Sequence, residues 1–361
     1  MDNNGSVIAL TVQDNNASHV DNVTNDNCTS SVNYAATAFY MDTVVVGTLC
    51  VIGYVGNVLS FVVFWPERKK CTSFYLLLAL AVADILYLTH CLLFQSFRSI
   101  YDYTGLFKEY KDAWPYMEPW EYPFGMMAQT LGLWFVVLVA VDRYIGVCWP
   151  FKAVSWCTNT RTCVMIVVTA IGAVLVNLPW FWRQRTVEQF DPCTREMEPV
   201  LVHYGIGETQ LGRTLHTGTQ IALAFLLPLA ALFFFNLRLI VSLRQGSKRR
   251  DQLQKGFGSD AAASAEDTQI TIMLVAVLVV YIVCELPVFT NHVLYATVGY
   301  LGVSHSHFNV ACNMLATLNC SCNFFIYCVF RASFRRRIQH MCCASQYGDS
   351  CPSCETEPSN L

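Results

Sequence analysis

Seven stretches of this sequence are long, apolar and almost free of charge, and they restrict the fold more than any other feature. Each covers at least 20 residues, enough for an α-helix to cross the roughly 30 Å of hydrocarbon in a bilayer. Only two interior positions carry a charge, Asp84 and Glu285. A soluble fold would need seven buried helices with almost no polar face. We therefore predict an all-α fold, a seven-transmembrane helix bundle, with spans at residues 43–66, 74–94, 122–141, 162–182, 214–237, 268–291 and 306–330.

The composition also favours a membrane protein over a soluble one. Hydrophobic residues make up 54% of the 361 residues and charged residues 14%, whereas soluble domains contain about 25% charged residues. The formal net charge of −3 gives no indication of a nucleic-acid partner. We therefore expect contact with membrane lipid and none with nucleic acid.

The distribution of Lys and Arg predicts the orientation. Sixteen of these 23 residues lie after spans one, three and five or in the C-terminal tail. Because positively charged loops stay on the cytoplasmic side, we predict a multi-pass plasma-membrane protein with its N-terminus outside and its C-terminus in the cytosol. The start, MDNNGSVIAL, lacks the basic region and apolar core of a secretory signal. We expect the first span to act as an uncleaved anchor.

Three regions follow from this topology. Residues 41–330 form the transmembrane domain, and residues 331–361 form a cytoplasmic helix and tail. Residues 1–40 form an extracellular tail, rich in Asn, Asp, Ser and Thr, in which N-x-S/T sequons predict glycosylation at Asn4, Asn16, Asn22 and Asn27.

The segment after the seventh span, FRASFRRRIQHMCC, has the pattern of an amphipathic helix. Apolar residues at Phe330, Phe334 and Ile338 alternate with arginines, which is typical of a helix lying on the inner leaflet. Cys342 and Cys343 at its end are candidate palmitoylation sites. The alternative is that both are unmodified cytosolic thiols.

Asp84 lies in the middle of the second span, where a carboxylate costs about 2.5–3.5 kcal/mol on insertion scales. It should therefore face the interior of the bundle and polar partners. The candidates are Asn57 in the first span and Asn319 and Asn323 in the seventh. Such a cluster suits a bundle that must rearrange, and the alternative is a carboxylate retained only for packing specificity.

An adjacent pair of opposite charges, Asp142 and Arg143, closes the third span in the stretch WFVVLVAVDRYIGVCWPF. Asp142 can neutralise Arg143 in one state, and a partner protein or Tyr327 can engage the arginine in another. The alternative is a snorkelling arginine at the membrane interface.

Prolines inside the spans provide hinges for such a rearrangement. Pro179, Pro228 and Pro287 fall within spans four, five and six. A buried proline weakens the backbone hydrogen-bond ladder of a helix and kinks it.

Taken together, these motifs resemble the rhodopsin-like (class A) G-protein-coupled receptors over nearly the whole chain. The motifs are GNVLS, LALAVAD, DRYIGVCWPF, CELP and NFFIY, together with Pro228. Within that class the chain is most similar to the invertebrate FMRFamide-receptor family of neuropeptide receptors. That narrower resemblance rests on SIYDYTGLF, YPFGMMAQT, DRYIGVCWPFKA and NLPWFW, and on Phe324, where most such receptors have proline.

The resemblance implies an extracellular peptide ligand, a heterotrimeric G-protein partner and no cofactor or metal at a catalytic site. Arg143 would be engaged by the G protein, with Asp142 as its resting partner and Tyr144 completing the motif. Phe151 would insert into the G-protein α-subunit.

The same resemblance implies roles inside the bundle. Asn323 and Tyr327 would form the switch of span seven, next to Asn57. Asp84 would be the sodium-linked carboxylate, but the serine expected on span three falls at Gly132, which makes sodium dependence doubtful.

The chain departs from the family at the disulfide position, because the cysteine expected at the start of span three is Glu118. We hypothesise that Cys193 in the second outer loop pairs instead with Cys28 in the N-terminal tail. The alternatives are a free thiol, or a bond to Cys91 or Cys312. Span four also lacks its usual tryptophan, which concerns packing more than function.

The third departure is Glu285, which stands where the family has a tryptophan two residues before Pro287. An acid in a membrane span requires a cation, a hydrogen-bond network or a proton. Helical spacing places Phe289 and His292 on its face, and Gln129 and Gln220 should reach the same outward-facing pocket. Because the family's ligands end in Arg-Phe-amide, we hypothesise that Glu285 forms the pocket floor and binds the ligand arginine. The alternative is a protonated, structural Glu285.

Other functions are less well supported. A transporter or proton pump would use two intramembrane carboxylates, but no repeat of the transporter kind is visible. A retinal pigment would need a lysine in the seventh span, and residues 306–330 contain none. No motif of an intramembrane enzyme is present. A receptor for a different peptide or for an amine remains the main alternative.

Overall fold

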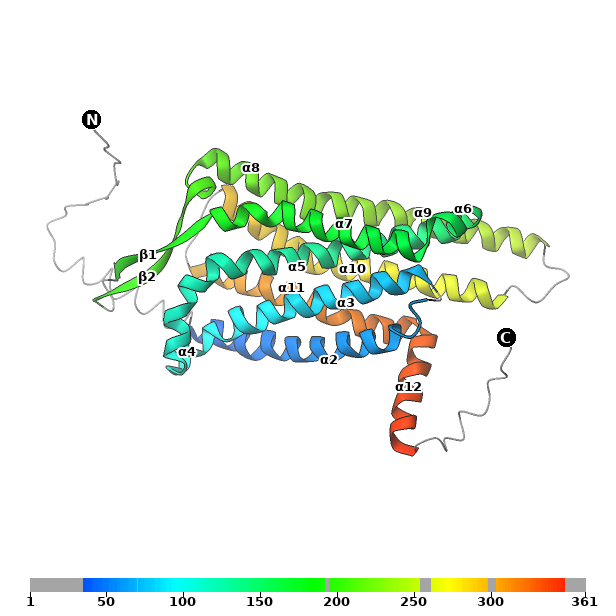
Figure 1. Cartoon of the computed structure of the whole chain (residues 1–361), viewed down its shortest axis with the longest axis horizontal. Helices are drawn as coiled ribbons and strands as arrows, with labels where there is room; N and C mark the ends of the chain where they lie inside the picture. Colours follow the sequence, from blue (N-terminus) through cyan, green and yellow to red (C-terminus); the bar gives the residue numbers. More distant parts are fainter. Residues whose placement is uncertain (1–34, 70, 192–194, 254–260, 298–302, 348–361) are drawn as a thin grey trace.

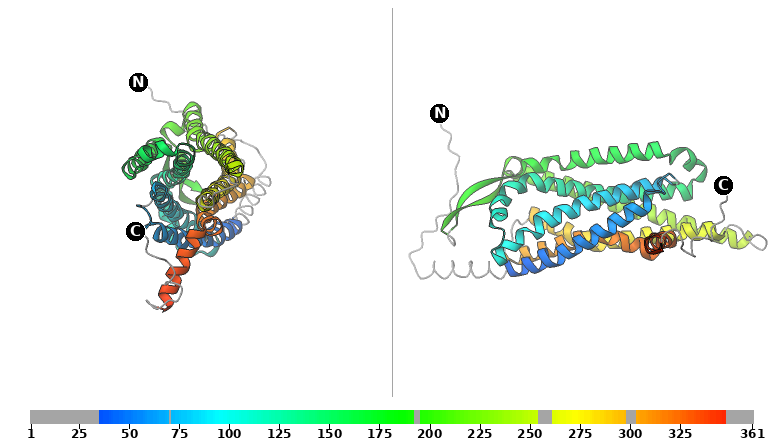
Figure 2. Two further views of the ribbon diagram at one scale, coloured as in Figure 1. Left: turned by 90° about the vertical axis from the view of Figure 1, so that its right-hand side faces the viewer. Right: turned by 60° about the horizontal axis from the view of Figure 1, so that its bottom comes forward.

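The computed structural model describes residues 35–69, 71–191, 195–253, 261–297 and 303–347. Within these ranges the helices pack side by side as one elongated bundle (Figures 1 and 2). Seven of them are long and apolar enough to cross a membrane, namely Ala35–Phe64, Thr72–Tyr101, Lys108–Cys148, Asn159–Trp182, Gln210–Gln245, Ile272–Leu294 and His307–Phe330. The predicted seven-helix bundle is confirmed.

Short irregular segments interrupt the long helices. From Phe39 on, the elements of the described ranges are, in order, η1 (Phe39–Val46), α2 (Gly47–Phe64), α3 (Thr72–His90), η2 (Cys91–Ser96), α4 (Arg98–Thr104), α5 (Lys108–Cys148), α6 (Pro150–Trp156), α7 (Asn159–Asn177), η3 (Leu178–Trp182), β1 (Gln184–Asp191), β2 (Glu196–His203), η4 (Gly205–Gly207), α8 (Gln210–Gln220), η5 (Ile221–Leu226), α9 (Leu227–Leu253), α10 (Ala261–Thr297), α11 (Val303–Phe330) and α12 (Ala332–Tyr347). We call the end with Arg143 and α12 the inner end, and the end with the β-strands the outer end.

Two of the three predicted proline sites coincide with a change of helix type. Pro179 is the second residue of the 3₁₀ segment η3, and Pro228 is the second residue of α9, directly after the π-helical segment η5. Because proline has no N–H, the backbone there cannot continue the regular ladder. Pro287, by contrast, lies within the continuous helix α10.

The first outer connection is helical rather than a long loop, which corrects the expectation that the third span begins near residue 122. Helix α5 starts at Lys108 and includes Pro115, Pro119 and Pro123. Their four-residue spacing puts all three on one helix face, so the missing N–H groups are confined to that face.

A β-hairpin covers part of the outer end, so the otherwise helical fold contains a two-stranded sheet. Strands β1 and β2 pair antiparallel from Gln184↔His203 to Asp191↔Glu196. Pro119 cannot donate to the carbonyl of Pro115, and Thr186 of β1 donates its hydroxyl to that oxygen at 2.5 Å. Hydrogen bonding thus ties the hairpin to α5 near Glu118, where the family has its disulfide.

The inner half of the core extends into α12. Phe334 is 1% exposed and packs against Phe64 and Tyr327, while Arg337 forms an ion pair with Glu67 at 2.7 Å. The predicted amphipathic helix is present and runs away from the bundle (Figure 1). Its apolar face, however, packs partly on protein rather than lying wholly on lipid.

Candidate functional site

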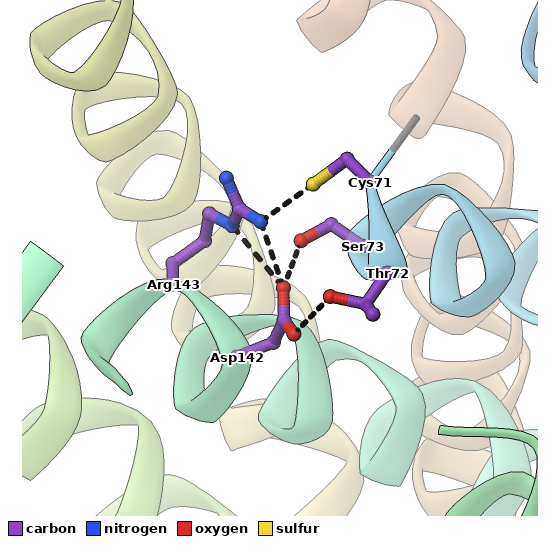
Figure 3. Close-up of polar contacts among 5 residues, drawn as sticks. All are labelled: Cys71, Thr72, Ser73, Asp142 and Arg143. Carbon is purple, nitrogen blue, oxygen red and sulfur yellow. Dashed lines mark hydrogen bonds and ion pairs between the residues drawn. The ribbon is translucent and has the colours of Figure 1, made fainter. Parts of the chain in front are cut away.

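Five residues form a polar cluster at the inner end, where α5 meets the start of α3 (Figure 3). Arg143 Nη2 donates to Asp142 Oδ2 at 2.8 Å and to Cys71 Sγ at 2.9 Å. Thr72 donates its hydroxyl to Asp142 Oδ1 at 2.6 Å, and Ser73 donates to Oδ2. We call these five residues the Asp142 cluster.

Sequence reasoning predicted the pair of Asp142 and Arg143 but missed its three supporting residues. Cys71 is the extended residue before α3, and Thr72 and Ser73 begin the helix and are buried. Hydroxyl groups and positive dipole at a helix N-terminus stabilise a carboxylate. The Cys-Thr-Ser run at the start of the second span was visible in the sequence. Only the packing of α3 against α5 shows that these residues face Asp142 and Arg143.

Because the resemblance predicts Asp142 as the resting partner of Arg143, we expect the Thr72→Ala/Ser73→Ala double variant to raise signalling in the absence of ligand. Each hydrogen bond to a charged group contributes about 1.5–3 kcal/mol, and losing part of that from the resting arrangement should increase basal activity roughly three- to tenfold. The measurement is nucleotide exchange or cyclic AMP without agonist, normalised to surface receptor. Ser155→Ala is the control, because Ser155 is exposed and donates only to the Lys152 carbonyl. Equal basal activity in both variants would contradict the prediction.

Asp84 has one of its three predicted partners. Asn323 Nδ2 donates to Asp84 Oδ2 at 2.7 Å. The predictions for the other two amides are wrong. Asn57 donates to the carbonyls of Gly53 and Cys320 at 3.0 and 3.1 Å, and Asn319 donates to Glu285 at 3.3 Å.

A sodium site at Asp84 is not supported by its surroundings. A Cβ atom on Gly132 would lie 3.5 Å from Asp84 Oδ1, so this glycine lies beside the carboxylate but offers no hydroxyl ligand. In the described ranges no group of three or more His, Cys, Asp or Glu side chains could hold a metal ion.

A cavity of about 350 Å³ runs along the inside of the bundle. It is lined by all five predicted pocket residues, Gln129, Gln220, Glu285, Phe289 and His292. The expectation that Glu285 closes the bottom is wrong, because Asp84 and Asn323 line the cavity as well. Both intramembrane carboxylates therefore face one space, which we call the central cavity.

Glu285 is 8% exposed and is held by amides of two neighbouring helices. Gln129 of α5 donates to Oε2 at 3.3 Å, and Asn319 of α11 donates to Oε1 at 3.3 Å. No cationic side chain within the described ranges forms an ion pair with it. The carboxylate therefore combines a hydrogen-bond network with room for an additional cation.

The other predicted pocket residues are fixed by packing. Phe289 stacks on Phe225 with ring centroids 4.4 Å apart. Gln220 Nε2 donates to the Val176 carbonyl at 3.1 Å, whereas its Oε1 is buried without a partner among the described residues. Gln220 thus keeps an unused acceptor in the cavity wall.

Residues 56–327 match the sequence model of the 7 transmembrane receptor (rhodopsin family). This chain belongs to the rhodopsin family of seven-transmembrane receptors. As a rhodopsin-family receptor, it is a G-protein-coupled receptor and multi-pass membrane protein.

The receptor is also similar to FMRFamide receptors at modest identity. It is 28% identical to the FMRFamide receptor of Drosophila melanogaster over 306 residues, which are 82% of this chain and 53% of the relative. It is 25% identical to an FMRFamide peptide receptor of Caenorhabditis elegans over 324 residues, or 82% of this chain and 69% of the relative. The sex peptide receptor of Drosophila melanogaster is 26% identical over 230 residues, 60% of this chain and 52% of the relative. The receptor spans about half the length of the two fly relatives.

The remaining switch candidates of the receptor occupy different environments. Tyr144 packs on Phe235 and its hydroxyl accepts from Trp149 at 3.3 Å. Tyr327 is buried between Phe64 and Phe334, and no contact joins it to Arg143 in this state. Phe151 on α6 is 96% exposed, which leaves its ring available to a partner.

The sites predicted for covalent modification lie outside the described part of the receptor. This applies to the sequons at Asn4, Asn16, Asn22 and Asn27, to Cys28 and Cys193, and to the side chains of Cys342 and Cys343. The alternative partners of Cys193 are wrong, because Cys91 and Cys312 are buried free thiols.

Proposed function

We propose that this receptor binds an amidated neuropeptide of the FMRFamide type in the central cavity and activates a heterotrimeric G protein at the inner end. In this arrangement the N-terminus is extracellular, the C-terminus is cytoplasmic and the receptor lies in the plasma membrane. The observation that carries the proposal is the buried carboxylate of Glu285, which lines the cavity without a cationic partner among the described residues.

The chemistry of the ligand follows from this carboxylate. A peptide ending in Arg-Phe-amide brings a guanidinium group with several N–H donors, which matches a carboxylate better than any neutral group does. The ring of Phe225, stacked on Phe289 beside the cavity, provides an apolar surface for the terminal phenylalanine. The names of the fly and worm relatives, both FMRFamide receptors, support the same ligand class.

A chain of hydrogen bonds offers a route from the ligand to the switch. Asn319 and Asn323 lie one turn apart on α11, and they hold Glu285 and Asp84 respectively. A ligand arginine that draws Glu285 away from Asn319 would remove a bond between α10 and α11. The equilibrium would then shift toward an arrangement in which α11 is released, because only differential contacts can move a two-state equilibrium.

At the inner end, the active arrangement would free Arg143 from Asp142 and Cys71 so that the G protein can engage it. Phe151 would contact the α-subunit, and Tyr327 would follow the movement of α11. The receptor would promote nucleotide exchange on its partner without covalent chemistry of its own.

The terminal segments would support this function. We propose glycosylation at Asn4, Asn16, Asn22 and Asn27, palmitoylation at Cys342 and Cys343, and a Cys28–Cys193 disulfide that holds the N-terminal tail over the cavity. Helix α5 has Glu118 at the position where the resemblance predicts the cysteine that would pair with Cys193.

The test is a library of amidated neuropeptides applied to cells that express the receptor, with calcium and cyclic AMP as readouts. We expect peptides ending in Arg-Phe-amide to evoke signals that their free-acid forms do not. Activity of another amidated class with silence of the Arg-Phe-amides would reject the ligand assignment and favour a receptor for a different peptide or amine. Ion-dependent uptake without any G-protein signal would favour a transporter.

A further inference from the structure

A buried cationic cluster lies at the outer part of the central cavity and has no role in the function proposed so far. Arg183 is 6% exposed and lines the cavity together with Trp180 and His292. Its guanidinium carbon lies 4.5 Å from the centre of the Trp180 ring, and its Nη1 lies 3.4 Å from His216 Nδ1. We call Trp180, Arg183, His216 and His292 the Arg183 cluster.

The Arg183 cluster consists of hydrogen-bond donors and potential cations. Arginine can only donate, so the contact with His216 uses Nδ1 as the acceptor and leaves the ring proton on Nε2.

Two N–H groups of this cluster are unused. Trp180 Nε1 and His216 Nε2 are buried and have no hydrogen-bond partner among the described residues. A buried donor is destabilising until an acceptor reaches it. The cluster therefore combines a fixed positive charge with two vacant donors, which is the chemistry that recognises a carboxylate.

We propose that the Arg183 cluster binds a carboxylate of the peptide ligand. This inference rests on the proposed function, in which Glu285 binds the ligand arginine. Because an amidated C-terminus carries no charge, the carboxylate belongs to an Asp or Glu side chain upstream of that arginine. The ligand thus carries two opposite charges that match two separate parts of one cavity.

The offset of His292 from Glu285 along α10 gives a scale for where the acid stands in the peptide. His292 lies seven residues beyond Glu285 on α10, which is about 10 Å along a helix axis. An extended peptide covers about 3.3–3.6 Å per residue. The acidic residue therefore lies about three residues before the arginine, toward the outer end.

The probes are N-acetylated Asp-Phe-Leu-Arg-Phe-amide and its Asn-Phe-Leu-Arg-Phe-amide counterpart. A third peptide carries the Asp three residues further from the arginine, and a fourth is the free-acid form of the Asn peptide. Potency in a calcium or nucleotide-exchange assay is measured on the wild-type receptor and on Arg183→Gln. The ratio of Asp to Asn potency is taken within each receptor, so it does not depend on expression level.

On the wild-type receptor we expect the Asp peptide to be about tenfold or more as potent as the Asn peptide, as for a charge-assisted hydrogen bond. On Arg183→Gln the ratio should fall to about one. Moving the Asp outward should remove its advantage.

Two variants control for indirect effects. Arg185→Gln removes an equal charge two residues away, from an exposed side chain that does not line the cavity, and should keep the wild-type ratio. If Arg183→Gln fails to reach the cell surface, Arg183→Lys takes its place. Lysine keeps the positive charge but lacks the planar guanidinium group, so the ratio of Asp to Asn potency should be intermediate.

The outcomes separate this inference from the proposed function. If the amidated peptides are active but Asp and Asn are equivalent, or their ratio is unchanged in Arg183→Gln, the Arg183 site is rejected and the proposed function stands. If only the free acid is active and loses potency in Arg183→Gln, the cluster binds a C-terminal carboxylate instead. Silence of the wild-type receptor to all four peptides overturns both.

Discussion

An Arg143→Ala receptor should bind its agonist and fail to signal. Arg143 contributes three hydrogen bonds to the Asp142 cluster, and in the proposed active arrangement the same guanidinium would be the group that the G protein engages. Removing one partner of a buried charge contact costs about 2–5 kcal/mol, so agonist-evoked nucleotide exchange should fall by well over tenfold. The measurement is GTP-analogue binding to membranes, with agonist affinity determined separately in membranes stripped of G protein.

The matched control for Arg143→Ala is Arg161→Ala. Arg161 lies on the same inner side, is exposed, and donates to the Ser155 carbonyl at 2.7 Å. Signalling should survive there, because surface charges of this kind contribute little. Full agonist-evoked signalling in Arg143→Ala at normal surface expression would refute the switch role of this arginine.

A Glu285→Gln receptor should lose most of its response to Arg-Phe-amide peptides. Glutamine keeps the shape of the side chain and can still bond to Gln129 and Asn319, so the bundle should remain intact. What is lost is one charge-assisted contact with the ligand, about 1.5–3 kcal/mol, or roughly 10- to 150-fold in potency. Dose–response curves for Phe-Met-Arg-Phe-amide on both receptors measure the shift.

A neutral ligand isostere distinguishes a direct contact from a structural role. Replacing the ligand arginine by citrulline should weaken binding to the wild-type receptor and have little further effect on Glu285→Gln. Glu109→Gln, which removes an exposed acid at the outer start of α5, is the control and should leave potency nearly unchanged. If Glu285 is instead a protonated structural acid, Glu285→Gln will respond to the arginine peptide as the wild type does.

The polar residues inside the bundle illustrate how far the sequence could predict the site. Asp84 and Glu285 were recognisable because a carboxylate in a hydrocarbon span must face the protein interior. Helical spacing then predicted that Gln129, Phe289 and His292 share a pocket with Glu285, and all of them line the central cavity. The choice of partners could not be predicted, because the rotation of α11 directs Asn319 to Glu285 and Asn323 to Asp84.

The outer end was the least predictable part. The predicted spans leave residues 95–121 as a connection between spans two and three, yet that segment is mostly helical. Confining Pro115, Pro119 and Pro123 to one face preserves the ladder elsewhere, and Thr186 supplies the hydrogen bond that Pro119 cannot. Arg183 was likewise not recognised as a cavity residue, since a single arginine after a span usually marks only the membrane interface.

By itself, the sequence determined that this chain forms seven membrane helices and carries Asp142 and Arg143 at one end, since hydrocarbon accepts only long, apolar, internally bonded segments. The tertiary structure alone decided which side chains meet across helices. Thr72 and Ser73 reach Asp142, Cys71 reaches Arg143, and Arg183 reaches the cavity that contains Glu285. Those contacts depend on how each helix is rotated, on how deep each residue lies in the bundle and on the path of the outer hairpin. Packing between residues tens of positions apart in the sequence determines all three.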